Sequence, residues 1–236
     1  MKDYFNKKFI ILFLSITIII ISLFIFSYIH LGIESNNYKY KITDNSLLHK
    51  LDKIVIIGDS RMWLIDRSRD KLNIPDNIIF DAESGARINW LYEKGLLKLY
   101  KIMKDMDKNY KYNVVFNLGV NDLDSDSEAI KLAEDYFNTY KKIIVNNKNI
   151  SFYILSVNPI DEITLYEKFD KESKRTSKRI EEFNNYFVKR LEKENLKNAK
   201  YCDSYNNLKF VMPDGLHYNL DTDKRIISYI IGNCVE

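Results

Sequence analysis

The amino-acid sequence predicts an α/β fold, a three-layer sandwich with helices on both faces of a five-stranded parallel sheet. Short apolar runs alternate with amphipathic stretches along residues 51–236, and the first run ends in glycine, as a buried parallel strand often does. No internal repeat or low-complexity block interrupts the pattern. Alternating buried strands and helices are typical of parallel sheets with right-handed crossovers.

Five apolar runs are the predicted strands, in chain order 53–58, 78–80, 114–118, 152–157 and the weaker 199–202. Between them, helical spacing of apolar residues predicts helices. The segment from Ser125 to Glu128 reads as a capping box that opens a long helix. The expected buried faces of the last three helices are Ile130, Ala133, Phe137, Tyr140 and Ile144; Ile180, Phe183, Phe187 and Leu191; and Ile226, Tyr229 and Ile230.

Composition limits the class of protein. The 236 residues suffice for one well-cored domain and a short extra segment, and 46% of them are hydrophobic, which excludes a disordered chain. The 36 basic and 33 acidic residues leave a net charge of only +3, so we expect no nucleic-acid partner. Two cysteines cannot form a disulfide scaffold or a four-cysteine zinc site. We expect neither a metal ion nor a cofactor.

Both cysteines are expected to be free thiols. Cys202 falls in the fifth strand and Cys234 follows the last helix. That helix should run antiparallel to the strand, and about ten helical residues would carry its end about 15 Å along the sheet. A disulfide requires Cα atoms within about 7 Å.

The N-terminal region predicts a membrane anchor. Residues 9–29 are 21 residues without a charge, and a helix of that length rises about 30 Å, enough to cross the hydrocarbon core. Lys2, Lys7 and Lys8 precede the span and should stay in the cytoplasm. We therefore expect a cytoplasmic tail at 1–8, a single transmembrane helix at 9–29 in the lipid bilayer, a stalk at 30–50 and an extracellular catalytic domain at 51–236. The alternative is a cleaved signal peptide, although no small-x-small cleavage site follows.

Candidate functional residues follow the predicted strands. Four segments stand there: 58–61 (GDSR), 83–87 (ESGAR), 119–122 (GVND) and 213–218 (PDGLHY). They hold four of only seven glycines, which indicates backbone positions that need glycine. Because ligands bind outside the carboxyl ends of parallel strands, these segments should form one site.

Three side chains in these segments suit nucleophilic catalysis. His217 is the only histidine inside the predicted globular domain. A lone histidine is more often structural, but Asp214 lies three residues earlier and can orient its ring. Ser60 stands where a strand turns into a helix, which exposes its hydroxyl and points its N–H toward a developing oxyanion. A serine with a histidine base and an aspartate is the arrangement that activates a poor nucleophile.

With these motifs the sequence resembles the SGNH (GDSL-type) hydrolases over about residues 53–218. The resemblance implies a flavodoxin-like sandwich with five parallel strands. It also implies that Ser60 is the nucleophile, that His217 is the base and that Asp214 orients it. The implied oxyanion hole is the N–H of Ser60, the N–H of Gly85 and the side-chain amide of Asn121.

Several neighbouring residues are candidates for substrate binding. Arg61 replaces the leucine of the family's name-giving pattern, and it lies beside the nucleophile as Arg87 lies beside the oxyanion glycine. Either arginine can bind an anionic group, or pair with an aspartate nearby such as Asp59 or Asp122. Tyr218 is a further candidate. Trp63 and Trp90 are expected to pack in the core, with a sugar-stacking wall as the alternative.

Other signals are weaker. The acidic stretch at 122–133 lacks the glycine and glutamate that a calcium loop needs at its sixth and twelfth positions. No glycine-rich phosphate-binding motif follows the first strand. The basic segment 171–179 reads as a solvated loop and helix start, or as a contact for anionic envelope polymers or lipid headgroups.

The sequence therefore predicts a membrane-anchored extracytoplasmic serine esterase that forms an acyl-serine intermediate. The expected substrate is a short acyl ester, acetyl first, on cell-envelope carbohydrate. Alternatives are an O-acetyltransferase with the same triad, a lipase or phospholipase, and a non-catalytic anchored binding subunit. The oligomeric state is not predicted.

Overall fold

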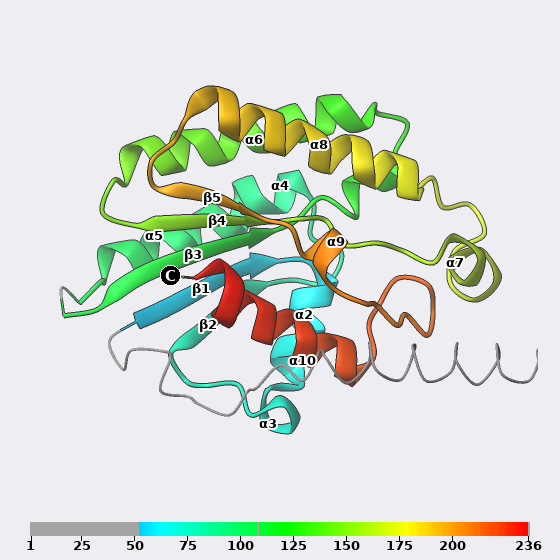
Figure 1. Cartoon of the computed structure of the whole chain (residues 1–236), viewed down its shortest axis with the longest axis horizontal. Coiled ribbons are helices and arrows are strands. Elements are labelled where there is room, and N and C mark those ends of the chain that lie inside the picture. The colour runs from blue at the N-terminus through cyan, green and yellow to red at the C-terminus, as the bar shows by residue number, and fades with distance from the viewer. Residues whose placement is uncertain (1–51, 108, 236) are drawn as a thin grey trace, which may run out of the picture. The chain divides into compact units, whose positions relative to one another are not determined.

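The computed structural model describes residues 52–107 and 109–235, and a five-stranded parallel sheet lies at their centre (Figure 1). The strand order is β2-β1-β3-β4-β5, with every neighbouring pair parallel. The predicted five-stranded α/β fold is therefore confirmed. The strands are β1 (Asp52–Gly58), β2 (Ile78–Ala82), β3 (Lys111–Asn117), β4 (Ser151–Leu155) and β5 (Ala199–Cys202).

Helices follow each strand. They are α2 (Ser60–Arg67), α3 (Arg69–Leu72), α4 (Ile88–Trp90), the π-helical turn η1 (Leu91–Gly95), α5 (Leu96–Lys104), the 3₁₀ turn η2 (Asp122–Asp124), α6 (Ala129–Asn146), α7 (Glu162–Lys168), α8 (Ser177–Glu194), α9 (Ser204–Asn207), α10 (Leu220–Tyr229) and the π-helical turn η3 (Ile230–Cys234).

The strand order decides which helices share a face. The chain steps from β1 to β2 in one direction, and then from β2 past β1 to β3, β4 and β5 in the other. Right-handed crossovers therefore place α2 and α3 on one face, and α4 to α6 and α8 on the opposite face. In Figure 1, α6 and α8 lie above the sheet while α2, α3 and α10 lie below it. The reversal of direction between β1 and β3 creates the switch point where α/β proteins bind ligands.

The apolar strands supply both halves of the core. Val55 and Ile57 of β1 join the cluster that includes Phe116, Tyr140 and the helices α6 and α8. Ile54 and Ile56, also fully buried, alternate with them and so face the α2 and α10 side. Because both faces are covered, the strand reads as a continuous apolar run.

The start of α6 differs from the expected capping box. The helix begins at Ala129, and the Glu128 N-cap makes no side-chain capping bond. The Ser125 hydroxyl instead donates to the carbonyl of Asp122 at 2.7 Å and closes the preceding 3₁₀ turn. Ile130, expected on the buried face, is 52% exposed, while Phe137 and the other expected positions of that face are buried.

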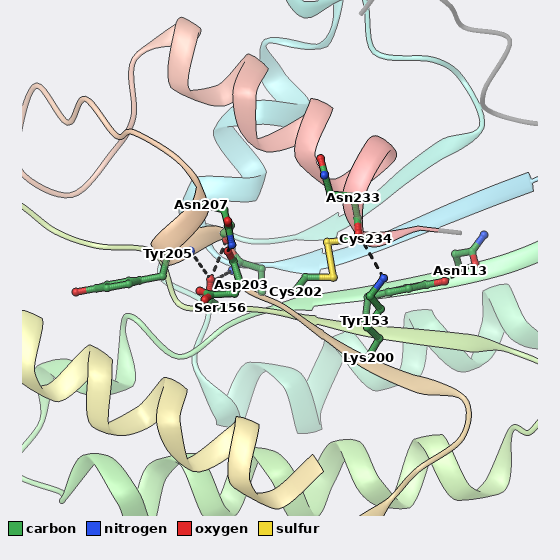
Figure 2. The surroundings of a disulfide bond; sticks show 12 residues. Asn113, Tyr153, Ser156, Lys200, Cys202, Asp203, Tyr205, Asn207, Asn233 and Cys234 are labelled. Atoms are coloured by element: carbon green, nitrogen blue, oxygen red, sulfur yellow. Dashed lines mark hydrogen bonds between the residues drawn. A yellow bond between two sulfur atoms is a disulfide. The ribbon is translucent and has the colours of Figure 1, made fainter. Parts of the chain in front are cut away.

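The cysteines also differ from expectation. Cys202, at the end of β5, and Cys234, at the end of η3, form a disulfide with Cα atoms 5.7 Å apart (Figure 2). The prediction of free thiols was wrong because it neglected the connection at 203–219. That segment carries the chain beyond the carboxyl end of the sheet before α10 begins, so the returning helix ends level with Cys202.

The predicted membrane span at 9–29, its flanking tail and the stalk lie outside the described residues. Among the residues that the structure does describe, no helix is both long enough and apolar enough to cross a bilayer.

Candidate active site

Ser60 is the first residue of α2 and lies immediately beyond the carboxyl end of β1. Asp59 caps this helix, because its side chain accepts a 3.0 Å hydrogen bond from the backbone N–H of Arg61. Gly58 has no room for a side chain, since a Cβ there would lie 2.4 Å from the Cβ of Met62. The serine is thus held on the first turn of a helix, where N–H groups lack intrahelical partners and carry partial positive charge.

His217 joins Ser60 to Asp214. Its Nε2 lies 3.0 Å from the Ser60 Oγ, and its Nδ1 lies 2.8 Å from Oδ2 of Asp214. Because an ionised carboxylate only accepts hydrogen bonds, Nδ1 carries the proton and the Nε2 lone pair faces the serine hydroxyl. The three predicted residues therefore come together from two segments 157 positions apart in the chain.

The Asp214 carboxylate is held in its ionised form. Burial raises the pKa of its carboxyl, but hydrogen bonds from the His217 ring and from the backbone N–H groups of His217 and Leu216 outweigh that effect, so the pKa lies below its usual value. Those two N–H groups reach Oδ1 at 2.7 and 2.9 Å. Asp214 therefore fixes both the ring tautomer and the turn on which the ring stands.

Arg61 supports this turn from inside and does not reach a substrate. Only 2% of the residue is exposed, and its guanidinium donates to the carbonyls of Leu216 (3.1 Å), Asn158 (2.9 Å) and Pro159 (3.0 Å). The expectation that Arg61 binds an anionic substrate group is corrected, because backbone oxygens occupy its donors. Its guanidinium does not pair with Asp59 either, since only the backbone N–H of Arg61 does so.

Tyr218 belongs to the same internal support. The Arg61 guanidinium lies 4.9 Å from the centre of its ring, and burial raises the pKa of its phenol. Its hydroxyl is buried and so is not placed to hydrogen-bond a substrate, although the residue as a whole is only half-buried. Arg87, in contrast, is exposed and remains a candidate for substrate binding. Trp90 is buried, as core packing predicts.

The oxyanion segments are tied to each other. Gly85 has a φ of +74°, in the left-handed region that favours glycine, and lies in a turn closed by a 3.1 Å bond from the Ala86 N–H to the Glu83 carbonyl. The Asn121 side-chain amide donates to the carbonyl of Ala86 at 3.0 Å. An amide nitrogen has two hydrogens, so one remains to serve an oxyanion.

Asp122 holds the other side of the same segment. Its Oδ1 accepts the N–H of Ile88 at 3.2 Å, and its Oδ2 accepts the Tyr136 hydroxyl at 2.6 Å. Burial raises the pKa of the Asp122 carboxyl, while these hydrogen bonds act in the opposite direction. Asn121 and Asp122, which follow β3, thus hold segment 85–88 by hydrogen bonds to Ala86 and Ile88.

Arg175 is a site residue that the sequence did not reveal. It is 7% exposed, and its Nε donates to the Val120 carbonyl at 3.0 Å while its Nη2 lies 3.4 Å from Oδ1 of Asn121. Asp124 pairs with its Nη1 at 3.0 Å. The basic segment 171–179 is therefore not wholly solvated, because one of its cations orients the Asn121 amide. The sequence did not single out Arg175, because four other basic residues lie in the same segment.

Helix α7 is the second missed feature. It packs so closely on the loop of Asp214 that a Cβ at Gly215 would lie 2.1 Å from the Leu165 nitrogen. Gly215 has a φ of +84°, and its carbonyl accepts the Asp161 N–H at 2.9 Å. Phe169, at the end of α7, places its ring 5.4 Å from the His217 ring, edge to face.

This arrangement can perform acyl transfer through a serine nucleophile. A base in the tautomer that can accept a proton faces a hydroxyl, and the three residues expected to donate to an oxyanion, Ser60, Gly85 and Asn121, follow β1, β2 and β3 at the carboxyl edge of the sheet. In residues 52–107 and 109–235 no group of three or more His, Cys, Asp or Glu side chains is arranged to hold a metal ion.

Solved structures with similar folds come from several bacteria. A protein from Streptococcus pneumoniae proposed to be a platelet activating factor has a TM-score of 0.57 and 14% identity, covering 78% of this chain and 84% of that one. A proposed acylhydrolase from Bacteroides fragilis has a TM-score of 0.54 and 15% identity, covering 84% and 92%. The catalytic domain of peptidoglycan O-acetyltransferase A from Streptococcus pneumoniae has a TM-score of 0.50 and 16% identity, covering 76% and 88%. At these identities the likeness concerns the fold.

In sequence, no curated protein matches the chain. The model of the GDSL-like lipase/acylhydrolase family, however, matches residues 54–230. This range makes up most of the chain and contains every motif of the site. The fold, the order of the motifs and this match agree, and the chain belongs to the GDSL-like lipase/acylhydrolase (SGNH) family of enzymes.

Proposed function

We propose that the protein is a serine esterase that removes short acyl groups, acetyl first, from carbohydrate of the cell envelope. The observation that carries the proposal is the Ser60–His217–Asp214 relay, with its 3.0 and 2.8 Å contacts. A non-catalytic binding subunit would not need this geometry. Labelling of Ser60 by a fluorophosphonate probe, followed by peptide mass spectrometry, tests the assignment; an unlabelled Ser60 in the folded full chain would contradict it.

In the first half-reaction, His217 Nε2 takes the Ser60 proton as Oγ attacks the ester carbonyl carbon. The carbonyl oxygen becomes an oxyanion that accepts hydrogen bonds from the N–H groups of Ser60 and Gly85 and from the Asn121 amide. Collapse breaks the bond to the alcohol oxygen, which receives the proton from His217. The products are the free alcohol and an acyl-Ser60 ester.

In the second half-reaction, water loses a proton to His217 Nε2 and attacks the acyl carbon. The proton then returns to the Ser60 oxygen as the carboxylic acid leaves. Throughout, Asp214 stays ionised and stabilises the imidazolium that forms twice.

The acyl group is proposed to be short. A series of p-nitrophenyl esters from acetate to octanoate tests this on the full chain. We expect the highest kcat/KM with acetate and a fall of at least tenfold at octanoate, which corresponds to about 1.4 kcal/mol in transition-state binding. A kcat/KM that rises with chain length would favour a lipase or phospholipase.

A second candidate is an O-acetyltransferase, in which a sugar hydroxyl replaces water. The fold likeness to the catalytic domain of peptidoglycan O-acetyltransferase A favours it. Incubation with p-nitrophenyl acetate and an N-acetylglucosamine oligosaccharide separates the two. Acetate release alone indicates an esterase, whereas mass spectrometry that finds acetylated oligosaccharide indicates a transferase.

We also propose that the domain lies outside the cell, anchored by residues 9–29 with the N-terminus in the cytoplasm. The Cys202–Cys234 disulfide supports this, because such bonds persist mainly in oxidising compartments. Cell fractionation should find the chain in the membrane, and external protease should digest its domain in intact cells. A shortened form released into the medium would show that residues 9–29 are a signal peptide.

A further inference from the structure

Exposed apolar side chains lie on α7 and on both sides of the loop that carries the candidate base. Among the described residues, half of the large hydrophobic side chains that are exposed lie on two segments that flank the loop of His217: Ile163, Tyr166, Phe169, Val211 and Leu220. Exposed apolar residues are ordinary when scattered, but a gathering at one place indicates a contact surface. We therefore expect a ligand to bind at this surface.

Helix α7 and the histidine loop form one rigid unit at this place. The close packing of Leu165 on Gly215 leaves no room between them, and the Lys168 ammonium reaches the Pro213 carbonyl at 3.4 Å. Figure 1 shows α7 beside the loop that precedes α10. Tyr166 lies one turn before Phe169 and so on the same face of α7. Tyr166 and Phe169, 59% and 51% exposed, thus present two aromatic side chains on this side of α7, and the Phe169 ring contacts the His217 ring.

The chemistry of the triad decides which part of a substrate meets this surface. The alcohol oxygen must accept its proton from His217 Nε2, so the alcohol portion of the ester lies against the imidazole and its surroundings. The oxyanion points away from it, toward Gly85 and Asn121. Phe169, 5.4 Å from the imidazole, therefore lies where the alcohol portion leaves the site.

We propose that Phe169 and Tyr166 form a subsite for a saccharide ring in the alcohol portion of the ester. The inference rests on the proposed function, because it locates the sugar of that substrate. Aromatic faces carry negative charge and attract the C–H groups on the flat face of a pyranose. Exposed carboxylates on the same helix can accept hydroxyl hydrogen bonds: Glu167, and Glu162 through the oxygen that does not accept the Ser177 N–H.

The same carboxylates disfavour other occupants. Together with Asp161 they outnumber the exposed Lys168 on this segment, and the net negative charge disfavours the anionic headgroups of a membrane. A fatty chain needs a concave apolar site, whereas Ile163, Tyr166 and Phe169 each have more than half of their surface in solvent. Planar aromatic rings bordered by carboxylates fit a sugar better than either.

The first test compares two alcohols with the same acyl group. Acetate release by the full chain is measured with fully O-acetylated chitobiose and with ethyl acetate. We expect Phe169→Ala to lower kcat/KM for the disaccharide ester at least fivefold more than for ethyl acetate, and Phe169→Trp to restore it. Tyr100→Ala, which removes a similarly exposed ring on α5, should leave the ratio of the two unchanged. An equal loss on both esters, or a larger loss on p-nitrophenyl octanoate, would overturn the subsite.

The second test needs no turnover. Saturation-transfer NMR on the Ser60→Ala chain should detect binding of chitotetraose, and the additional change Phe169→Ala should reduce the signal at least threefold. A signal that is absent, or unaffected by Phe169→Ala, would overturn the subsite. Binding that depends on Phe169 in a chain whose wild type cleaves no ester would support the subsite and reject the proposed esterase.

Discussion

The Arg61 side chain donates from Nε to the carbonyl oxygen of Leu216 at 3.1 Å, and so joins the residue after the candidate nucleophile to the residue before the candidate base. Its other two bonds, to Asn158 and Pro159, fasten the same guanidinium to the segment after β4. One buried cation thus sets the distance between two loops that carry the triad. A site held in this way needs little rearrangement before reaction.

Replacement of Arg61 should therefore reduce stability and activity together. Arg61→Lys keeps the charge but cannot reach three carbonyls at once, because only the guanidinium offers a planar fork of donors. We expect a loss of about 2–4 kcal/mol in the free energy of unfolding and a melting temperature lower by about 5–10 °C. Arg67→Lys, the same change at an exposed position of α2, is the control for calorimetry and should differ little from wild type.

Loss of the nucleophile or the base should abolish ester turnover. Ser60→Ala and His217→Ala are each expected to lower kcat by several orders of magnitude, and the double variant should be no worse, because triad members act as a unit. Melting temperatures should stay within a few degrees of wild type. The exposed Ser127→Ala serves as control. Near-normal hydrolysis of p-nitrophenyl acetate by Ser60→Ala would reject the assignment.

Arg175 is expected to act through Asn121. Removing an oxyanion donor, as in Asn121→Ala, should lower kcat about 10²–10³-fold. Arg175→Lys should lower kcat about tenfold with little change in KM, because the amide loses one of its orienting contacts. In the Asn121→Ala background the same change should have almost no further effect on kcat. Equal effects in both backgrounds would show that Arg175 only supports the fold, and Lys178→Ala is the exposed control.

The disulfide should be present in the folded protein. Peptide mapping without reduction should find Cys202 linked to Cys234. The variant with serine at both positions is expected to lose about 3–4 kcal/mol, mainly because its unfolded chain is less constrained. Alkylation of both cysteines before reduction would contradict the pairing.

The buried Asp223 carboxyl should make the free energy of unfolding depend on pH. Burial raises the pKa of its carboxyl to about 7 in the folded chain, against 3.8 as the ordinary value. Between these values the unfolded chain has lost the proton that the folded chain keeps, so stability falls as pH rises from about 4 to about 7 and stays lower above. Asp223→Asn removes this fall and should be more stable than wild type above pH 7 by on the order of 3 kcal/mol. Chemical unfolding at several pH values measures it, with the exposed Asp221→Asn as control; parallel curves for Asp223→Asn and wild type would contradict the prediction.

The sequence predicted what depends on local pattern. β1, β3 and β4 contain apolar runs because both sheet faces are covered there, and the triad residues follow β1 and β5 in the family's order. Contacts between segments that are distant in the chain could not be predicted from the sequence. Whether Arg61 meets a substrate depends on carbonyls at 158, 159 and 216, which only the folded chain brings to it. Arg175 was obscured in the same way, since its partners Val120 and Asn121 lie more than fifty positions away.

The pairing of the two cysteines also could not be predicted from local sequence pattern. The length of a helix can be predicted from spacing, but its starting point depends on the loop before it, and the loop at 203–219 has no periodic pattern. The aromatic residues on α7 were not predicted to lie at the site, for a related reason. Phe169 is separated from His217 by 48 positions, and nothing in its own segment indicates that the two rings meet.

The disulfide also makes residues 203–233 a closed covalent ring, and Asp214 and His217 lie inside it. A protease that cuts one peptide bond in this ring opens the backbone but releases no fragment. The base and its partner would remain attached to the strand that precedes them, and the nicked protein would separate into two pieces only after reduction. Tolerance of a single cut fits the location outside the cell proposed above, because exposed loops are frequent targets of cleavage.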